Sequence, residues 1–128
     1  MDWHFKSDAP IYTQLISQIK LGIVAGQLTP GDRMSTVREL AAEAGVNPNT
    51  MQRALQELER EGLVFTQRSS GRYVTEDVSI IEGAKMALAR QYIREFLDSM
   101  ERLGYRKDEI IGLLSGKEDE EEKDGGNT

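Results

Sequence analysis

The stretch "STVRELAAEAGVNPNTMQRALQELEREG", residues 35 to 62, carries two helical patterns separated by a glycine. Thr36 followed by Glu39 has the form of a capping box, in which the hydroxyl and the carboxylate each accept an N–H at the start of a helix. Gly45 suits a left-handed C-terminal turn, and Asn47, followed by a proline, can cap a second helix. Two helices joined by so short a turn predict a helix-turn-helix unit.

The second of these helices has two unlike faces. Its apolar residues recur at intervals of three and four, which predicts a buried face formed by Met51, Ala54, Leu55 and Leu58. The leading half of the other face has no carboxylate and carries amides, a hydroxyl and a guanidinium: Asn47, Asn49, Thr50, Gln52 and Arg53. Amides can pair with adenine and arginine with guanine, so this half of the helix is typical of a DNA-reading surface.

The flanking sequence completes a larger unit. Apolar residues from Pro10 to about Gly26 repeat with helical spacing, and "LVFTQRSSGRYV", residues 63 to 74, has the pattern of two short strands about a polar turn. The order helix, helix, helix, hairpin predicts a winged helix-turn-helix. The fold class is therefore expected to be mainly α with a small β-hairpin.

A long helix is predicted from Ser79 to Leu103, followed by a break at Gly104 and a last short helix over "DEIIGLLS". These two helices have little of their own to pack against, so we expect them to pair with a second copy of the chain. The proposed dimer interface consists of Ile81, Leu88, Tyr92, Phe96, Met100 and Leu103.

Charge and composition suggest three segments. The chain of 128 residues has a net charge of −6, and the two basic and six acidic residues of 117–128 account for −4 of it. We expect a DNA-binding domain over 1–76, a helical dimerisation segment over 77–115 and a disordered acidic tail over 116–128. With neither a leader sequence nor a long apolar run, the expected location is the cytoplasm, away from the membrane.

Catalysis and metal binding have little support in the sequence. There is no cysteine, and His4 is the only histidine, so neither a thiol nucleophile nor a histidine-based triad or zinc site can be assembled. Glycine patterns that bind phosphates or dinucleotides do not occur. The chain is expected not to be an enzyme, and no cofactor or metal is assigned.

The run "PGDRMSTVRELAAEAGVNPNTMQRALQELEREGLVFTQRSSGRYV" resembles the DNA-binding domain of GntR-type bacterial transcription regulators, and "APIYTQLISQIK" is similar to their first helix. The compact two-helix end is similar to the YtrA subfamily. This resemblance implies a homodimer that binds a partly palindromic operator as a repressor, with the recognition helix in the major groove and the wing on the minor groove or the backbone. The sequence departs from the family pattern at Ser35, in place of a proline, and in the wing at Ser69 and Arg72.

Residue patterns and resemblance together give the candidate DNA-binding set, which comprises Ser35, Thr36, Arg38, Asn47, Asn49, Thr50, Gln52, Arg53, Arg68, Ser70, Gly71 and Arg72. Simpler roles stay open for some of them. Asn47 can serve only as a cap, Gln52 and Arg53 can be a solvated face, and the two wing arginines can protect a sheet edge. A winged helix that binds another protein or RNA is the alternative function. The sequence does not identify an operator or a small-molecule effector.

Overall fold

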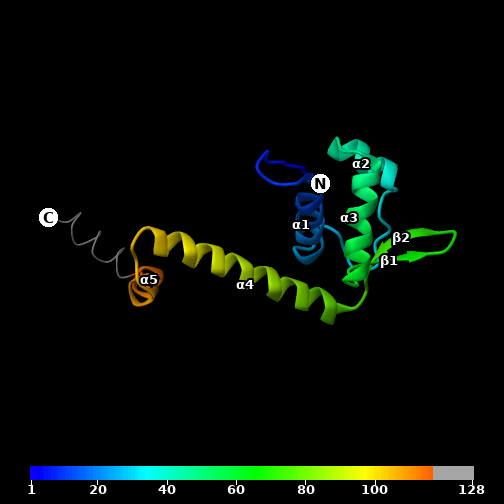
Figure 1. The fold of residues 1–128 in the computed structure, drawn as a ribbon. Coiled ribbons are helices and arrows are strands. Elements are labelled where there is room, and N and C mark those ends of the chain that lie inside the picture. The colour runs from blue at the N-terminus through cyan, green and yellow to red at the C-terminus, as the bar shows by residue number, and fades with distance from the viewer. Residues whose placement is uncertain (117–128) are drawn as a thin grey trace, which may run out of the picture. The chain divides into compact units, whose positions relative to one another are not determined.

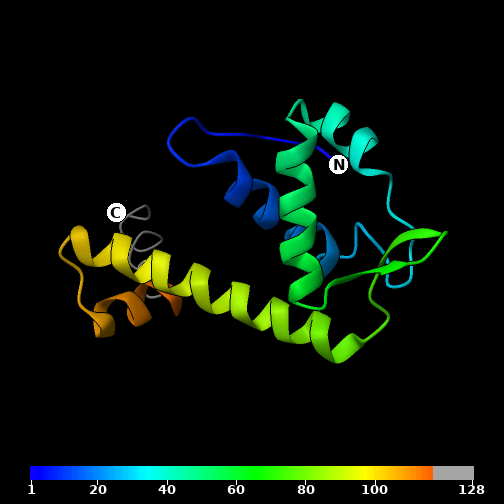
Figure 2. The same cartoon turned by 45° about the vertical axis from the view of Figure 1, so that its right-hand side comes forward.

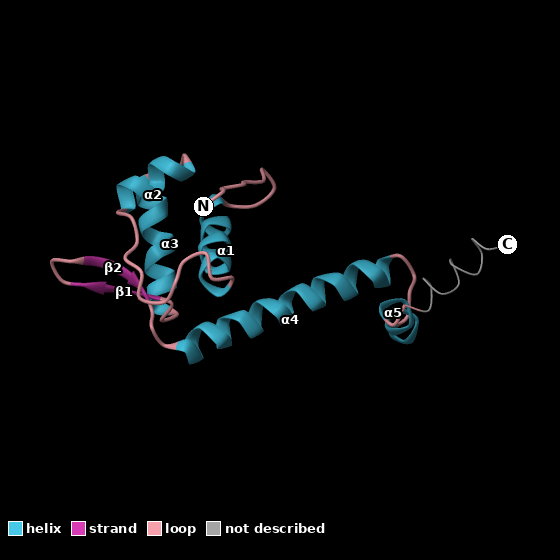
Figure 3. Ribbon diagram, turned by 180° about the vertical axis from the view of Figure 1, so that it is seen from behind, coloured by secondary structure: helices cyan, strands magenta, loops and turns pink. Residues whose placement is uncertain are grey.

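The computed structural model describes residues 1–116, which fall into two compact units, Met1–Met86 and a second beginning at Ala87. All of the expected acidic tail except Gly116 lies outside the described residues. The mainly helical fold with a small hairpin is confirmed (Figures 1 and 3). Its elements are α1 (Ile11–Val24), α2 (Val37–Ala44), α3 (Pro48–Arg60), β1 (Val64–Gln67), β2 (Gly71–Val74), α4 (Val78–Arg102) and α5 (Lys107–Leu114).

The signals that separate α2 from α3 act as predicted. Thr36 Oγ1 accepts the Glu39 N–H at 3.2 Å, and Glu39 Oε1 accepts the Thr36 N–H at 3.0 Å, which completes the capping box. Gly45 adopts φ 70°, a left-handed conformation that favours glycine. Asn47 Oδ1 then accepts the Asn49 N–H at 2.7 Å and caps α3. The helix-turn-helix is thus fixed by contacts among neighbouring residues.

The hairpin is antiparallel, and the loop before α2 pairs with its outer strand, β2. Within the hairpin, Val64 pairs with Val74, and Gln67 pairs with Gly71 next to the tip. On the other edge of β2, the Met34 N–H donates to the Arg72 carbonyl at 2.8 Å. Because this loop segment pairs with β2, the start of α2 is tied to the wing.

The first unit has one apolar core, and α3 contributes its whole inner face to it. Met51, Ala54, Leu55 and Leu58 are all fully buried, as their spacing predicted. In Figure 1, α3 lies between α1 and the hairpin, and it contacts both. In the turned view of Figure 2, α1 passes behind α3. Its inner face is therefore covered, and its outer face is left exposed.

The early turns of α4 belong to this same core. Ile81 is only 8% exposed, and Ile80 and Ala84 pack beside it. Ile81, one of the residues proposed for the dimer interface, is therefore already covered by the first unit of its own chain. Periodicity alone does not tell which partner a helix face meets.

In the second unit, the later turns of α4 leave large apolar side chains exposed, although α5 has a buried residue, Ile110. Ile93 is 56% exposed and Leu103 is 72% exposed. At the start of helix α5, the Arg106 N–H donates to Glu109 Oε1 at 2.9 Å. Within residues 1–116, no helix combines the length and the apolar character that a membrane span needs.

Candidate nucleic-acid interface

The outer face of α3 presents polar side chains over its leading two turns. Asn49 and Arg53 are exposed, and Thr50 and Gln52 are half-buried on the two flanks. Gln56, which the sequence analysis did not include, is exposed one turn further on. The first carboxylate of the helix is that of Glu57, so ten residues from Asn47 onward carry no negative side chain. This face can donate and accept hydrogen bonds without repelling a phosphate backbone.

Two of the predicted contact residues, Thr36 and Asn47, also cap helices. The side-chain oxygens of Thr36 and Asn47 accept helix N–H groups in their caps. The Asn47 amide NH₂ and the Thr36 hydroxyl proton are still available as donors. Capping therefore restricts these side chains to donating roles toward a ligand.

The three carboxylates at the end of α3 are engaged with neighbours and not merely solvated. Glu57 Oε2 lies 2.7 Å from Arg60 Nη1, and Glu61 Oε1 lies 2.7 Å from Lys20 Nζ of α1. Glu59 Oε1 accepts a hydrogen bond from the Thr66 hydroxyl of β1. Two of these contacts fasten α3 to the elements on either side of it, which fixes the orientation of its outer face.

Arg72 is less available than its place in the wing suggested. Its side chain is 14% exposed, and its Nε lies 3.8 Å from Glu59 Oε1. Within residues 1–116, this buried Nε has no hydrogen-bond partner. Arg72, a candidate DNA contact, therefore has most of its side chain covered, and the Glu59 carboxylate lies near its charge.

At the tip of the wing, Arg68 is exposed, and Ser69 has a left-handed backbone with φ 61°. The family pattern favours glycine here, and a side chain in this conformation is strained. Ser70, half-buried, has its hydroxyl against the Tyr73 hydroxyl. Of the predicted wing-tip residues, Arg68 is thus the one with an exposed charge.

Arg33 lies beside the predicted contact residues, although it is not in the candidate set. In the sequence it is one of several arginines within one forty-residue stretch, a cluster suited to phosphate. Its backbone forms an isolated bridge with Tyr73, and its guanidinium lies over Gly71, with Nε 3.1 Å from the place a Cβ would occupy. Beside it is a hollow of about 220 Å³ near the start of α2 and the wing; its lining includes Ser35, Thr36, Gly71 and Arg72. Four predicted residues are thereby brought together.

Arg53 is in contact with a side chain of α1. Its guanidinium carbon lies 4.6 Å from the centroid of the Tyr12 ring. The Tyr12 ring also packs partly against the core. Arg38, by contrast, is exposed on α2.

Two carboxyl groups outside the α3 face have lowered pKa values. The pKa of Glu39 is lowered mainly by the hydrogen bond from the Thr36 backbone, with a further contribution from the nearby Arg33 charge. The pKa of Asp77, before α4, is lowered by hydrogen bonds from Ser79. Both groups stabilise helix starts in their charged form, so neither has the raised pKa expected of a general acid.

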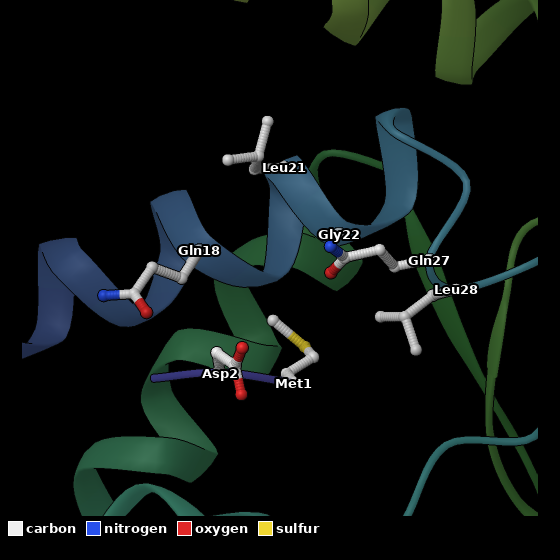
Figure 4. A pocket seen from close by; sticks show the side chains of 7 residues that line it. All are labelled: Met1, Asp2, Gln18, Leu21, Gly22, Gln27 and Leu28. Carbon is white, nitrogen blue, oxygen red and sulfur yellow. The ribbon is translucent and has the colours of Figure 1, made fainter. Parts of the chain in front are cut away.

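A cavity of about 500 Å³ lies on α1, away from the predicted contact residues (Figure 4). The side chain of Met1 lies beside Gly22 there, with Leu28 near it. The N-terminal segment is held along α1 by glutamine side chains: the Lys6 N–H donates to Gln14 Oε1 at 2.7 Å, and Gln18 Nε2 donates to the His4 carbonyl at 2.6 Å.

The remaining residues of the predicted dimer interface lie on α4 or directly after it. Tyr92, Phe96 and Leu103 are exposed, while Leu88 and Met100 are half-buried. All five share one side of a helix by their spacing. Within the second unit, these side chains therefore form an apolar stripe along one side of the helix.

Comparison with known proteins places these features in a family. The pattern described as "Bacterial regulatory proteins, gntR family" matches residues 11–74. The chain is 40% identical over 111 residues to the HTH-type transcriptional regulator YhcF of Bacillus subtilis, covering 87% of the chain and 92% of that protein. It is 39% identical over 94 residues to the HTH-type transcriptional repressor YtrA of Bacillus subtilis, covering 72% of each.

Solved structures agree with the sequence relatives. A GntR family transcriptional regulator from Listeria monocytogenes superposes with a TM-score of 0.79 at 40% identity, covering 87% of this chain and 97% of that one. The AraR DNA-binding domain, solved in complex with operator ORX1, matches with a TM-score of 0.54 at 25% identity, covering 59% of this chain and 96% of that one. The chain therefore belongs to the GntR family of bacterial regulatory proteins and is a transcription regulator with a DNA-binding helix-turn-helix domain.

Proposed function

We propose that this regulator is a cytoplasmic, homodimeric repressor that recognises a partly palindromic operator. The N-terminal part of α3 enters the major groove, and the wing contacts the minor groove or the backbone. The second unit pairs two copies. We propose the same boundaries as the sequence analysis: a DNA-binding domain over 1–76, a dimerisation segment over 77–115 and an acidic tail over 116–128.

One observation carries the proposal: the exposed face of α3 is polar and free of carboxylates over its leading turns. Asn49, Arg53 and Gln56 are exposed there, and each has the donors or acceptors needed to bond a base edge. A protein-docking surface is instead enriched in apolar and aromatic anchors. The chemistry of this face therefore favours a nucleic acid over a protein partner.

Two relatives support the finer points. One similar protein of Bacillus subtilis, YtrA, is named as a transcriptional repressor, and the AraR DNA-binding domain was solved with an operator. In this chain we assign phosphate contacts to the start of α2 and to Arg68, and base contacts to α3. Arg33 and Gln56 are added to the candidates of the sequence analysis.

The homodimer is inferred from the apolar stripe of α4. Exposed side chains of this size are destabilising in water when they form a continuous patch, and a second copy offers a matching surface. Two recognition helices set one helical turn apart, about 34–36 Å, would then read the two half-sites.

The experiment that tests the proposal is selection of bound sequences from a random duplex pool by the full chain. A palindromic enriched site is expected, and its half-site spacing reports the symmetry of the protein. Affinity for that site should fall with salt at a slope of about −5 to −9 in log K against log salt, if about 6–10 phosphates are neutralised. Failure to retain any duplex at low salt would refute the proposal. Stronger binding to a competing RNA than to duplex DNA would also refute it.

Site variants test the assignment residue by residue. Arg38→Ala and Arg53→Ala should each weaken operator binding by about tenfold or more while the thermal midpoint stays unchanged. Arg60→Ala is the matched control, because Arg60 lies at the far end of α3 and pairs with Glu57. Equal loss in all three variants would show that only overall charge matters.

A further inference from the structure

The contact between Arg53 and Tyr12 links the outer face of α3 to the helix beside it. At 4.6 Å from the ring centroid, the guanidinium lies within the range of a cation–π interaction. Tyr12 is the second residue of α1, and its half-buried ring packs against the core. Because the core restricts the ring, the ring gives Arg53 a defined surface to contact.

A guanidinium in cation–π contact with a ring keeps hydrogen-bonding capacity, because the N–H groups that face away from the ring are free to donate. What the contact removes is rotational freedom of a long side chain. A guanidinium with less freedom to lose gives up less entropy when it donates two parallel bonds to the O6 and N7 atoms of guanine.

The carboxylates near Arg53 do not compete for it. Glu57, one turn further along α3, bonds Arg60 at 2.7 Å, and Glu61 bonds Lys20 at 2.7 Å. Among residues 1–116, none of the ion pairs involves Arg53. In this part of the chain, the Arg53 guanidinium therefore contacts an aromatic ring and forms no ion pair. Because the ring is uncharged, the positive charge of Arg53 is not neutralised.

We propose that Tyr12 is a specificity-determining positioning residue: by stacking on Arg53 it orients that guanidinium to read one guanine in each half-site. This inference rests on the proposed function and deepens it. Tyr12 acts through Arg53 and makes no base contact of its own. Sequence reasoning could not supply this role, since 41 positions separate the two residues in the chain.

The test uses the full chain and the operator selected as above, with every base pair varied in turn. Tyr12→Leu should weaken binding by about two- to fivefold per half-site, the range of an exposed cation–π contact. The loss should be confined to one guanine position per half-site. Affinity for random duplex and its salt slope should stay as in the wild type, because the charge of Arg53 is retained.

Two variants separate positioning from other roles. Tyr12→Phe keeps the ring and loses the hydroxyl, so it should match the wild type. In an Arg53→Ala background, Tyr12→Leu should bring no further loss, because its effect passes through the guanidinium. If Tyr12→Leu lowers the thermal midpoint, the Tyr12→Met variant is used in its place, because methionine fills the space of the ring with a flexible side chain.

The outcomes are distinct. A guanine preference that weakens in Tyr12→Leu, persists in Tyr12→Phe and is absent from both Arg53→Ala proteins supports the proposal. Equal loss in Tyr12→Phe would assign the effect to a hydroxyl contact with DNA and overturn it, as would additive losses in the double variant. A wild-type chain that selects a palindrome without guanine dependence at Arg53 would overturn the inference alone, whereas one that binds no duplex would overturn the proposed function.

Discussion

Glu59→Ala is the perturbation that best tests how the wing is held against α3. Glu59 Oε1 accepts the hydrogen bond of the Thr66 hydroxyl and lies 3.8 Å from Arg72 Nε. The alanine variant leaves both groups without this partner. Since the Arg72 side chain is 14% exposed, its guanidinium cannot be fully rehydrated without moving the strand.

The magnitude follows from these two contacts. A hydrogen bond to a charged acceptor contributes about 1.5–3 kcal/mol, and the 38% exposure of the Glu59 side chain favours the lower end of that range. An ion pair of this kind adds about 0.2–1 kcal/mol. We expect the free energy of unfolding to fall by about 2 kcal/mol.

The assay is urea denaturation of the full chain followed by far-ultraviolet circular dichroism. With a slope of about 2 kcal/mol per molar urea, the midpoint should fall by about 1 M. Glu57→Ala is the matched control, because among residues 1–116 Glu57 pairs only with Arg60, whose side chain is 77% exposed. That pair should contribute about 0.3–0.5 kcal/mol.

A second variant separates the hydrogen bond from the charge. Glu59→Gln keeps an oxygen that can accept from Thr66 and removes the charge facing Arg72. It should lose less stability than the alanine variant, because the hydrogen bond from Thr66 is kept. If Glu59→Ala and Glu57→Ala unfold at the same urea concentration, the reasoning about the wing is refuted.

The remaining predictions concern the dimer, the wing tip and pH. Phe96→Asp should give particles of 14.4 kDa in sedimentation, while Ala87→Asp, on the opposite side of α4, should keep twice that mass; a dimer in both would reject the interface. Ser69→Gly should raise the free energy of unfolding by about 0.5 kcal/mol, because relief of left-handed strain exceeds the added chain entropy of glycine. The pKa values of Glu39 and Asp77 are lowered from 4.5 and 3.8, so their stabilisation is complete above those values and is lost as pH falls through the lower, folded-state pKa values. Urea midpoints between pH 7 and 3 should show this acid loss, and Glu39→Gln should reduce it.

Features set by neighbours in the chain were the ones that the sequence predicted well. The capping box at Thr36, the left-handed turn at Gly45 and the Asn47 cap each depend on residues two to four positions apart. The inner face of α3 was predicted for the same reason, because helical spacing alone decides which residues share a side.

Features that depend on contacts between distant residues were missed or misjudged. The sequence places Arg72 in the wing but does not show that Glu59 lies beside it. It places Ile81 on the apolar side of a helix but does not show that the core of the first unit covers it. Nor does it show that the Tyr12 ring contacts the Arg53 guanidinium. In each instance the sequence pattern gives the element on which the side chain lies. Its neighbour comes from a distant part of the chain, so it is known only from the tertiary fold.

The pairing of the loop before α2 with β2 also bears on self-association. Unpaired strand edges are templates on which other chains add strands, and two-stranded hairpins have two such edges. Here the Gly31 N–H donates to the Val74 carbonyl at 3.0 Å, and the Val74 N–H donates to the Asp32 carbonyl at 2.9 Å. Near its base, then, the outer edge of β2 is occupied by the chain itself, which blocks sheet-to-sheet aggregation through that edge at high protein concentration.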